Sequence, residues 1–169
     1  MDKKSLKVVR GINLNKNELI SKMKTERERW NNLIEKILEL KQENEIITKQ
    51  WILKDVVMDI YIYEQEIKNA IQSKTLKEHH FWSVSYPTKN KEIYLEREKY
   101  TLEKLLQLDE ENFEELLCEI QQLQDEDTVS QKFFIDSRTK LQTLIKDNSY
   151  GHYHDHIAIL VKRFHLTDY

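Results

Sequence analysis

Apolar residues recur at steps of three and four along most of the chain, which is the spacing of one face of an α-helix. The first such stretch covers residues 15–41, and Asn15 or Asn17 is suited to cap its start. A polar connection over 42–49 leads to a second stretch over 51–73. Both stretches are therefore predicted to be long amphipathic helices.

The second half of the chain continues this pattern. A third helical region is predicted over 91–123, with a break near 100–101, and a fourth helix over 137–164. Phe133 and Phe134 lie in the polar connection before the fourth helix and are expected to face the core. Four long amphipathic helices predict an all-α fold, a four-helix bundle in which each helix buries one face.

Residues 74–89 interrupt the helical pattern with an aromatic segment that contains the only proline, Pro87. Loops of this length are often functional, so the segment is either a lid over a pocket or a loop that folds back on the helices. His79 and His80 are adjacent and cannot share a helix face, so neither is expected to be a metal ligand.

The composition narrows the class of protein. Only two glycines and one proline are present, too few turn-forming residues for many strands. Charged residues make up 34% of the chain with a net charge of −3, without the basic stripe of a nucleic-acid-binding protein. No apolar run approaches the roughly 20 residues of a membrane span. We expect one domain over 1–169, with 1–13 as an N-terminal arm.

Two further features bear on the cellular compartment. The first residues, MDKKSLKVV, lack the apolar core of a signal peptide, which favours a cytoplasmic location. The single cysteine, Cys118, excludes an internal disulfide framework. Cys118 is expected to be a buried, apolar-like residue of the third helix and not a nucleophile.

Three histidines occupy alternate positions in the last helical stretch: His152, His154 and His156. A helix turns about 100° per residue, so His152 and His156 share one face while His154 points almost the opposite way. Their shared face also carries three apolar residues, Leu141, Ile145 and Ile159, and is expected to be the buried face of an amphipathic helix. His154 and His165 face away from this side and are expected at the surface or at an interface. Gly151 costs about 1 kcal/mol in a helix relative to alanine, which suggests close packing or a ligand beside it.

Asp59 interrupts the apolar face of the second stretch between Val56 and Tyr63. A carboxylate on a core face is costly unless it is paired, hydrogen-bonded or bound to a cation. If the second and fourth helices are neighbours, Asp59, His152 and His156 form a two-histidine, one-carboxylate site with open coordination positions. Such a site suits Zn, Fe, Ni or Mn. The alternative is that Asp59 only accepts hydrogen bonds from the histidines.

Two residues near this set have open roles. Tyr63, one turn beyond Asp59, either donates a hydrogen bond into the site or is a core tyrosine. Asp155 lies about 60° from the direction of His152, and a role as helper or fourth ligand is a minor alternative for it.

Four segments, in this order, resemble motifs of the DinB/YfiT-like four-helix-bundle superfamily, which includes poorly characterised bacterial members. WILKDVVMDIYIYE (Trp51–Glu64) resembles its second-helix signature, and NKEIYLERE (Asn90–Glu98) resembles the opening of its third segment. LQDEDTV (Leu123–Val129) is similar to its acidic turn, and NSYGHYHDHI (Asn148–Ile157) to its closing motif. The resemblance covers most of the chain. It implies an up-down-down-up bundle with a divalent metal between helices two and four, commonly within a homodimer.

The resemblance also implies a ligand set. His152 and His156 match two histidine ligands of the superfamily, and Asp59 stands where the third histidine would be. Aspartate still binds Zn, Fe, Ni or Mn, with a different charge and reach. Alternatively, Asp59 marks a member that has lost the metal.

Members of the superfamily carry out metal-assisted thiol transfer, isomerisation with a low-molecular-weight thiol, or hydrolysis, and a related branch protects cells against an electrophilic genotoxin. The resemblance therefore implies a metal-dependent hydrolase or thiol transferase in which metal-bound water or thiolate attacks a small electrophile, in detoxification or stress response. The alternative is a non-catalytic bundle, without the third histidine, that acts through binding a partner or ligand.

Overall fold

The structure is a computed structural model that describes residues 13–166, and all regular secondary structure within this range is helical. The predicted all-α class is confirmed. The predicted arm over 1–13 falls outside the described residues except for Asn13. Within the described range, no helix is both long and apolar enough to cross a membrane.

The first helix, α1 (Lys16–Glu39), begins where the sequence predicts. Its N-cap is Asn15, whose side-chain oxygen accepts a hydrogen bond from the backbone N–H of Glu18 at 2.9 Å. The Glu18 carboxylate in turn accepts from the backbone N–H of Asn15 at 2.8 Å. This reciprocal capping box satisfies two N–H groups that a helix leaves unpaired at its start.

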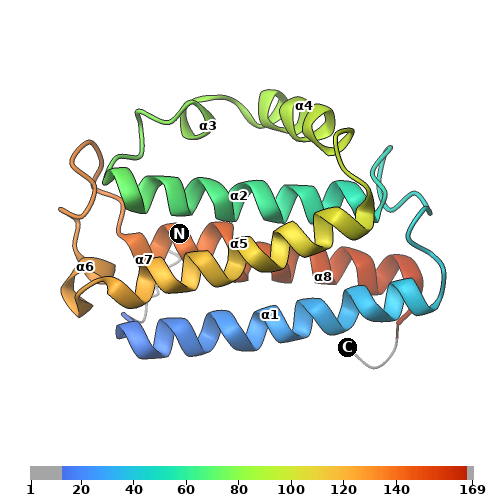
Figure 1. Cartoon of the computed structure of the whole chain (residues 1–169), viewed down its shortest axis with the longest axis horizontal. Coiled ribbons are helices and arrows are strands. Elements are labelled where there is room, and N and C mark those ends of the chain that lie inside the picture. The colour runs from blue at the N-terminus through green and yellow to red at the C-terminus, as the bar shows by residue number, and fades with distance from the viewer. Residues whose placement is uncertain (1–12, 167–169) are drawn as a thin grey trace, which may run out of the picture.

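The long helices lie side by side (Figure 1). Helices α2 and α5 run in one direction, and α1 and the α7–α8 pair run in the other. Lys68 and Gln72 of α2 hydrogen-bond Glu115 and Glu119 of α5, so the partner is 47 residues later in both pairs, as expected for parallel helices. The bounds of these helices are α2 (Leu53–Ser73), α5 (Leu102–Gln122), α7 (Leu141–Asn148) and α8 (Tyr150–Phe164).

The segment between α2 and α5 is more helical than the sequence predicts. It contains α3 (His80–Ser83) and α4 (Tyr86–Arg97), with the predicted break before α5 in place. Pro87 lies in the first turn of α4, where the N–H that proline lacks has no helical partner. The proline that marks a loop in the sequence therefore starts a helix.

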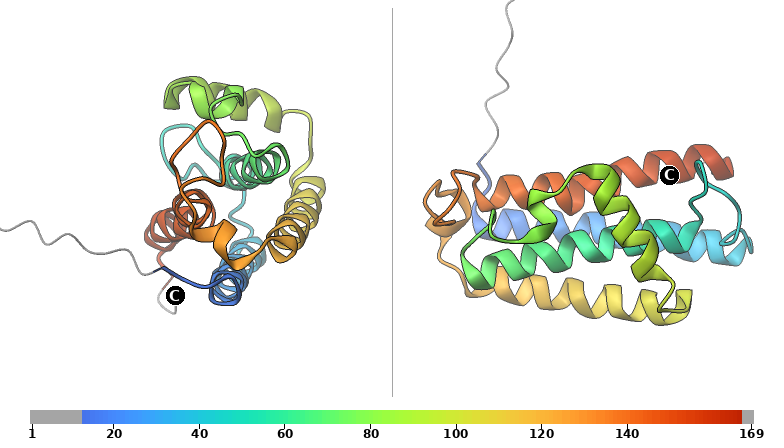
Figure 2. Two further views of the ribbon diagram at one scale, coloured as in Figure 1. Left: turned by 90° about the vertical axis from the view of Figure 1, so that its left-hand side faces the viewer. Right: turned by 90° about the horizontal axis from the view of Figure 1, so that it is seen from above.

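The α3–α4 segment packs across α2 (Figure 2). Phe81 is buried, and its ring meets that of Tyr63 edge to face, with 4.8 Å between centroids. Arg97 forms a buried ion pair with Asp55 of α2, Nη1 to Oδ2 at 2.9 Å. Of the two alternatives for the aromatic segment, folding back on the helices is the observed one.

The predicted single helix over 137–164 is wrong, because it divides at Ser149 into α7 and α8. Ser149 has φ −126° and ψ −99°, outside the helical region. The chain re-enters the helix so tightly that a Cβ on Gly151 would lie 2.2 Å from the carbonyl oxygen of Lys146. The expected close packing at Gly151 is therefore a backbone contact. A short helix, α6 (Asp125–Val129), precedes this pair.

The buried apolar side chains form one cluster between the long helices. Phe133 and Phe134 belong to it, as expected. Two expectations about burial are wrong. Ile159 is 42% exposed, because the inward face of α8 is centred on Tyr153 and Ile157. The side of α8 that carries His152, His156 and Ile159 lies at the border of this inward face. Cys118 is exposed, because it projects from the solvent side of α5.

Candidate metal centre

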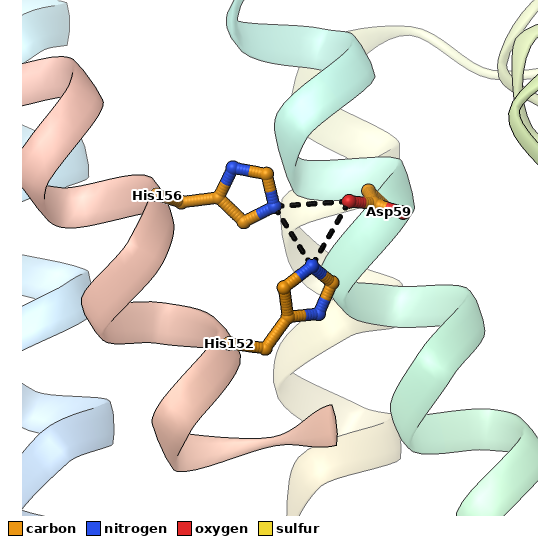
Figure 3. Close-up of side chains that lie close together, drawn as sticks. All are labelled: Asp59, His152 and His156. Atoms are coloured by element: carbon orange, nitrogen blue, oxygen red, sulfur yellow. Dashed lines mark hydrogen bonds and ion pairs between the residues drawn. The ribbon is translucent and has the colours of Figure 1, made fainter. Parts of the chain in front are cut away.

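Asp59 and the two histidines come together between α2 and α8 (Figure 3). The helices run antiparallel, and Asp59 in the second turn of α2 faces the first two turns of α8. Asp59 is 5% exposed. Its Oδ2 atom lies 2.9 Å from Nε2 of His156 and 3.1 Å from Nε2 of His152, and the two nitrogens are 3.0 Å apart. The predicted convergence of these three residues is observed.

The spacing of the three atoms fits a common metal ion. Imidazole nitrogens and carboxylate oxygens bind first-row divalent ions at about 2.0–2.1 Å. Two such bonds at a right angle place the ligand atoms about 3 Å apart, and two at the tetrahedral angle place them about 3.4 Å apart. The observed 2.9, 3.0 and 3.1 Å match one face of an octahedron. An ion held by Asp59, His152 and His156 would keep open positions for other ligands.

Protons satisfy this triangle poorly. A neutral imidazole nitrogen is either a donor or an acceptor. If both Nε2 atoms carry protons, two N–H groups face each other while pointing at one oxygen. If only one does, its N–H donates to Asp59, and the lone pair of the other nitrogen faces the carboxylate oxygen. If neither does, three lone pairs converge. A divalent cation accepts all three lone pairs without these conflicts.

The electrostatics of the site also suit a metal. Burial opposes ionisation of Asp59, but hydrogen bonds from His152 and His156 outweigh it and lower the pKa of Asp59 to about 2. Burial lowers the pKa of His156, although Asp59 favours its charged form. Asp59 is thus a carboxylate and His156 a neutral imidazole near neutral pH. A bound metal would take the place of the Nε2 protons that make these hydrogen bonds.

Aromatic rings hold both imidazoles in place. Trp51 stacks on His156, with 6.5 Å between centroids and 21° between ring planes. Tyr63 meets His152 edge to face at 4.7 Å. Burial, with the charge of Asp59, raises the pKa of Tyr63 well above its ordinary value, so its hydroxyl stays protonated. Within the described residues Tyr63 has no hydrogen bond to the three candidate ligands, and its role here is packing.

One atom of the site departs from the usual pattern. Metal-bound histidines generally donate their second ring N–H to a carboxylate, a carbonyl or water. Nδ1 of His152 is buried and has no hydrogen-bond partner among the described protein atoms. The orientation of His152 is therefore set by its ring contact with Tyr63 and by the two other ligand atoms.

The remaining candidates lie elsewhere. His154 is at the surface and pairs with Glu26, and His80 pairs with Glu92 at 2.8 Å. His165 is exposed, as expected. Asp155 is also exposed and is not among the residues that converge on the site.

A second buried polar cluster beside the site was not expected. The Glu64 carboxylate is fully buried and accepts hydrogen bonds from Ser149 Oγ at 2.6 Å and from the Tyr153 hydroxyl. Arg27 donates two hydrogen bonds in this cluster. Its Nη2 donates to Asp109 Oδ2 at 2.7 Å, and its Nη1 donates to the Tyr153 hydroxyl at 3.3 Å. Burial raises the pKa of Glu64 to about 7, although the nearby Arg27 opposes the rise.

This cluster joins α1, α2, α5 and α8 next to the histidines. Tyr153 follows His152 in the sequence and stacks on Trp30 at 5.7 Å, and Trp30 also contacts His156 at 6.5 Å. A signal was present in the sequence, because Arg27 lies on the apolar face between Met23 and Trp30 just as Asp59 interrupts its own.

The candidate metal centre is described from this chain alone. Comparison of the chain with protein-family models, with curated proteins and with solved structures finds no match.

Proposed function

We propose that this chain is a metal-dependent enzyme with the four-helix-bundle architecture of the DinB/YfiT-like superfamily, in up-down-down-up order. Asp59, His152 and His156 would hold one divalent ion, Zn, Ni, Fe or Mn. The reaction class is attack on a small electrophile, either hydrolysis or transfer of a low-molecular-weight thiol, with detoxification or stress response as its setting.

The arrangement of the helices supports the architectural part of the proposal. In chain order, the parallel helices α2 and α5 come after α1 and before the α7–α8 pair, and both of these run the other way (Figure 1). The two candidate histidines lie on the last of these helices and the carboxylate on α2. This is where the resemblance in sequence puts the metal.

The convergence of the three ligand atoms within 3.1 Å of one another carries the functional part. A divalent ion bound there would supply Lewis acidity and would lower the pKa of a water or thiol at its open positions. The chain itself supplies a negative carboxylate, two imidazoles fixed by Trp51 and Tyr63, and a largely buried setting in which electrostatic effects are strong.

The test is a pair of assays on protein reconstituted with each of the four metals. Hydrolysis is followed with 4-nitrophenyl acetate and thiol transfer with a chromogenic aryl halide plus 2-mercaptoethanol. We expect one metal to give turnover that is lost in Asp59→Ala and kept in Asp155→Ala, a carboxylate removal on the exposed side of α8. Turnover that survives in Asp59→Ala would contradict the proposal.

A second candidate, a non-catalytic bundle, is favoured by two observations. The distances within the triangle are also hydrogen-bond distances, and Nδ1 of His152 lacks the partner that a ligand histidine usually has. In this case Asp59→Leu would be tolerated or stabilising, since removal of a buried polar group with its shape preserved can be favourable. Thermal unfolding of Asp59→Leu beside the metal-loaded and metal-free wild type separates the two candidates.

The proposal includes a homodimer. Light scattering on the metal-loaded protein tests it, and a monomer at micromolar concentrations would contradict this part alone.

A further inference from the structure

Lys89 is a buried lysine in the first turns of α4 that the proposed function does not use. It is 7% exposed. Its Nζ atom lies among four aromatic rings, 4.5 Å from the centroid of Phe81, 5.2 Å from Trp82, 5.4 Å from Tyr86 and 5.5 Å from Tyr63. Aromatic faces attract a cation, but they accept none of the hydrogen bonds that an ammonium group donates in water.

No carboxylate within the described part of the chain lies at ion-pair distance from Lys89. The other two buried cations are paired, Arg27 with Asp109 and Arg97 with Asp55. Burial lowers the pKa of Lys89, and the charge of Asp59 is what opposes this effect. The ammonium group is thus surrounded mainly by aromatic rings, lacks an anion of its own, and lies within the electrostatic reach of the Asp59 carboxylate.

The Tyr63 side chain contacts both Lys89 and that centre. The Tyr63 ring contacts His152 at 4.7 Å and Lys89 Nζ at 5.5 Å. The segment that carries Lys89 crosses α2 (Figure 2) and is fixed there by the Arg97–Asp55 ion pair. Lys89 is therefore held near the site by a rigid support, which is how binding residues are usually positioned.

The positive charges of the metal centre and of Lys89 favour an anionic ligand. A divalent ion held by one carboxylate and two neutral imidazoles keeps one excess positive charge, and Lys89 adds a second. An ammonium group that lacks a partner gains most from a charged acceptor, because hydrogen bonds between ionised groups are the stronger ones.

We propose that Lys89 binds the carboxylate of a small anionic ligand whose other end reaches the metal held by Asp59, His152 and His156. This inference rests on the proposed function and narrows its substrate class to carboxylate-bearing molecules. Lys89 would orient the ligand, and the surrounding rings would cover the ligand's apolar part.

The test uses Co²⁺-loaded full-length protein and two thiols that differ in one charge, 3-mercaptopropionate and its methyl ester. Thiolate binding to Co²⁺ is followed by absorption, which needs no turnover. We expect wild type to bind the acid at least about tenfold more tightly than the ester, as one charge-assisted contact allows. Lys89→Met should abolish this preference while leaving the affinity for the ester unchanged, and Lys89→Arg should keep most of it.

Two further variants make the result decisive. Lys91→Met removes an exposed lysine from the same helix and should behave as wild type. Lys89→Gln is a second neutral replacement, used if methionine perturbs the fold. An unchanged preference in both neutral Lys89 variants would overturn the inference, as would equal binding of acid and ester by wild type. Failure of wild type to bind Co²⁺ would overturn the proposed function, and this inference with it.

Discussion

Oδ2 of Asp59 lies 2.9 Å from Nε2 of His156, although 97 residues separate them in the sequence. Each residue by itself is an unusual polar group on an apolar helix face. Their contact makes the two polar residues parts of one site, because the negative carboxylate and the neutral imidazole can both donate a lone pair to the same cation.

Removal of this carboxylate should abolish metal binding without unfolding the protein. In Asp59→Ala we expect divalent-metal affinity to fall by more than about a hundredfold, since loss of a ligand should cost at least what loss of a supporting residue does. Helicity by circular dichroism should change little. Calorimetric titration gives the affinity, with His154→Ala as a matched control that removes a surface imidazole from the same helix. Full affinity in Asp59→Ala would show the ligand assignment to be wrong.

Stability should fall as pH rises from about 5 to 7 because of Glu64. Burial, partly offset by Arg27, raises the pKa of Glu64 from 4.5 to about 7, so between these values the folded protein holds a proton that the unfolded chain has released. The contribution of Glu64 is fully present below the unfolded pKa and is lost as pH rises through the folded pKa. At about 1.4 kcal/mol per pKa unit, the loss is at most about 3 kcal/mol.

Glu64→Gln tests this prediction, because the amide keeps an acceptor for Ser149 and Tyr153 but does not titrate. Urea unfolding of both proteins at several pH values gives the slopes. We expect a shallower decline in Glu64→Gln between pH 5 and 7. Identical slopes would mean that Glu64 is ionised throughout this range in the folded protein.

Gly151→Ala should destabilise the protein, opposite in sign to the usual effect in a helix. Alanine normally gains about 1 kcal/mol over glycine inside a helix. Here its Cβ would lie 2.2 Å from the carbonyl oxygen of Lys146, a backbone atom that moves only if the junction of α7 and α8 shifts. We expect a net loss of about 1–3 kcal/mol, typical of overpacking. A gain in unfolding free energy would show that the junction is not constrained.

Arg27→Met should cost about 3–5 kcal/mol, because it leaves the buried Asp109 without its ion-pair partner. The double variant Arg27→Met/Asp109→Leu should recover part of that loss, since it removes both buried charges. Lys22→Met, a half-exposed cation on the same helix, serves as the control. Equal losses in the single and double variants would argue that packing, and not charge, makes Arg27 important.

The sequence predicted the long helices and the candidate ligands for the same reason. Apolar positions repeat with the helical period, so a polar residue that falls on them, as Asp59 does, is conspicuous. The Asn15 cap was recognisable because capping is a local interaction. The break at Ser149 was not, because the helical pattern keeps its phase across it and the hydroxyl bonds a glutamate 85 residues away.

The other misses have similar causes. Lys89 and Glu64 do not stand out in the sequence, because charged residues are frequent in this chain and usually solvated. Which of them is buried depends on how α4 and the long helices pack, which periodicity does not determine. Pro87 was misleading because proline both ends helices and begins them.

The most direct test of the central claim is the metal content of the protein, purified without an affinity tag or chelator and measured by elemental mass spectrometry beside His156→Ala. A metal held by Asp59, His152 and His156 requires close to one Zn, Ni, Fe or Mn per chain in wild type and almost none in the variant. Wild type without metal, and with no rise in unfolding temperature when any of the four ions is added, would contradict this claim.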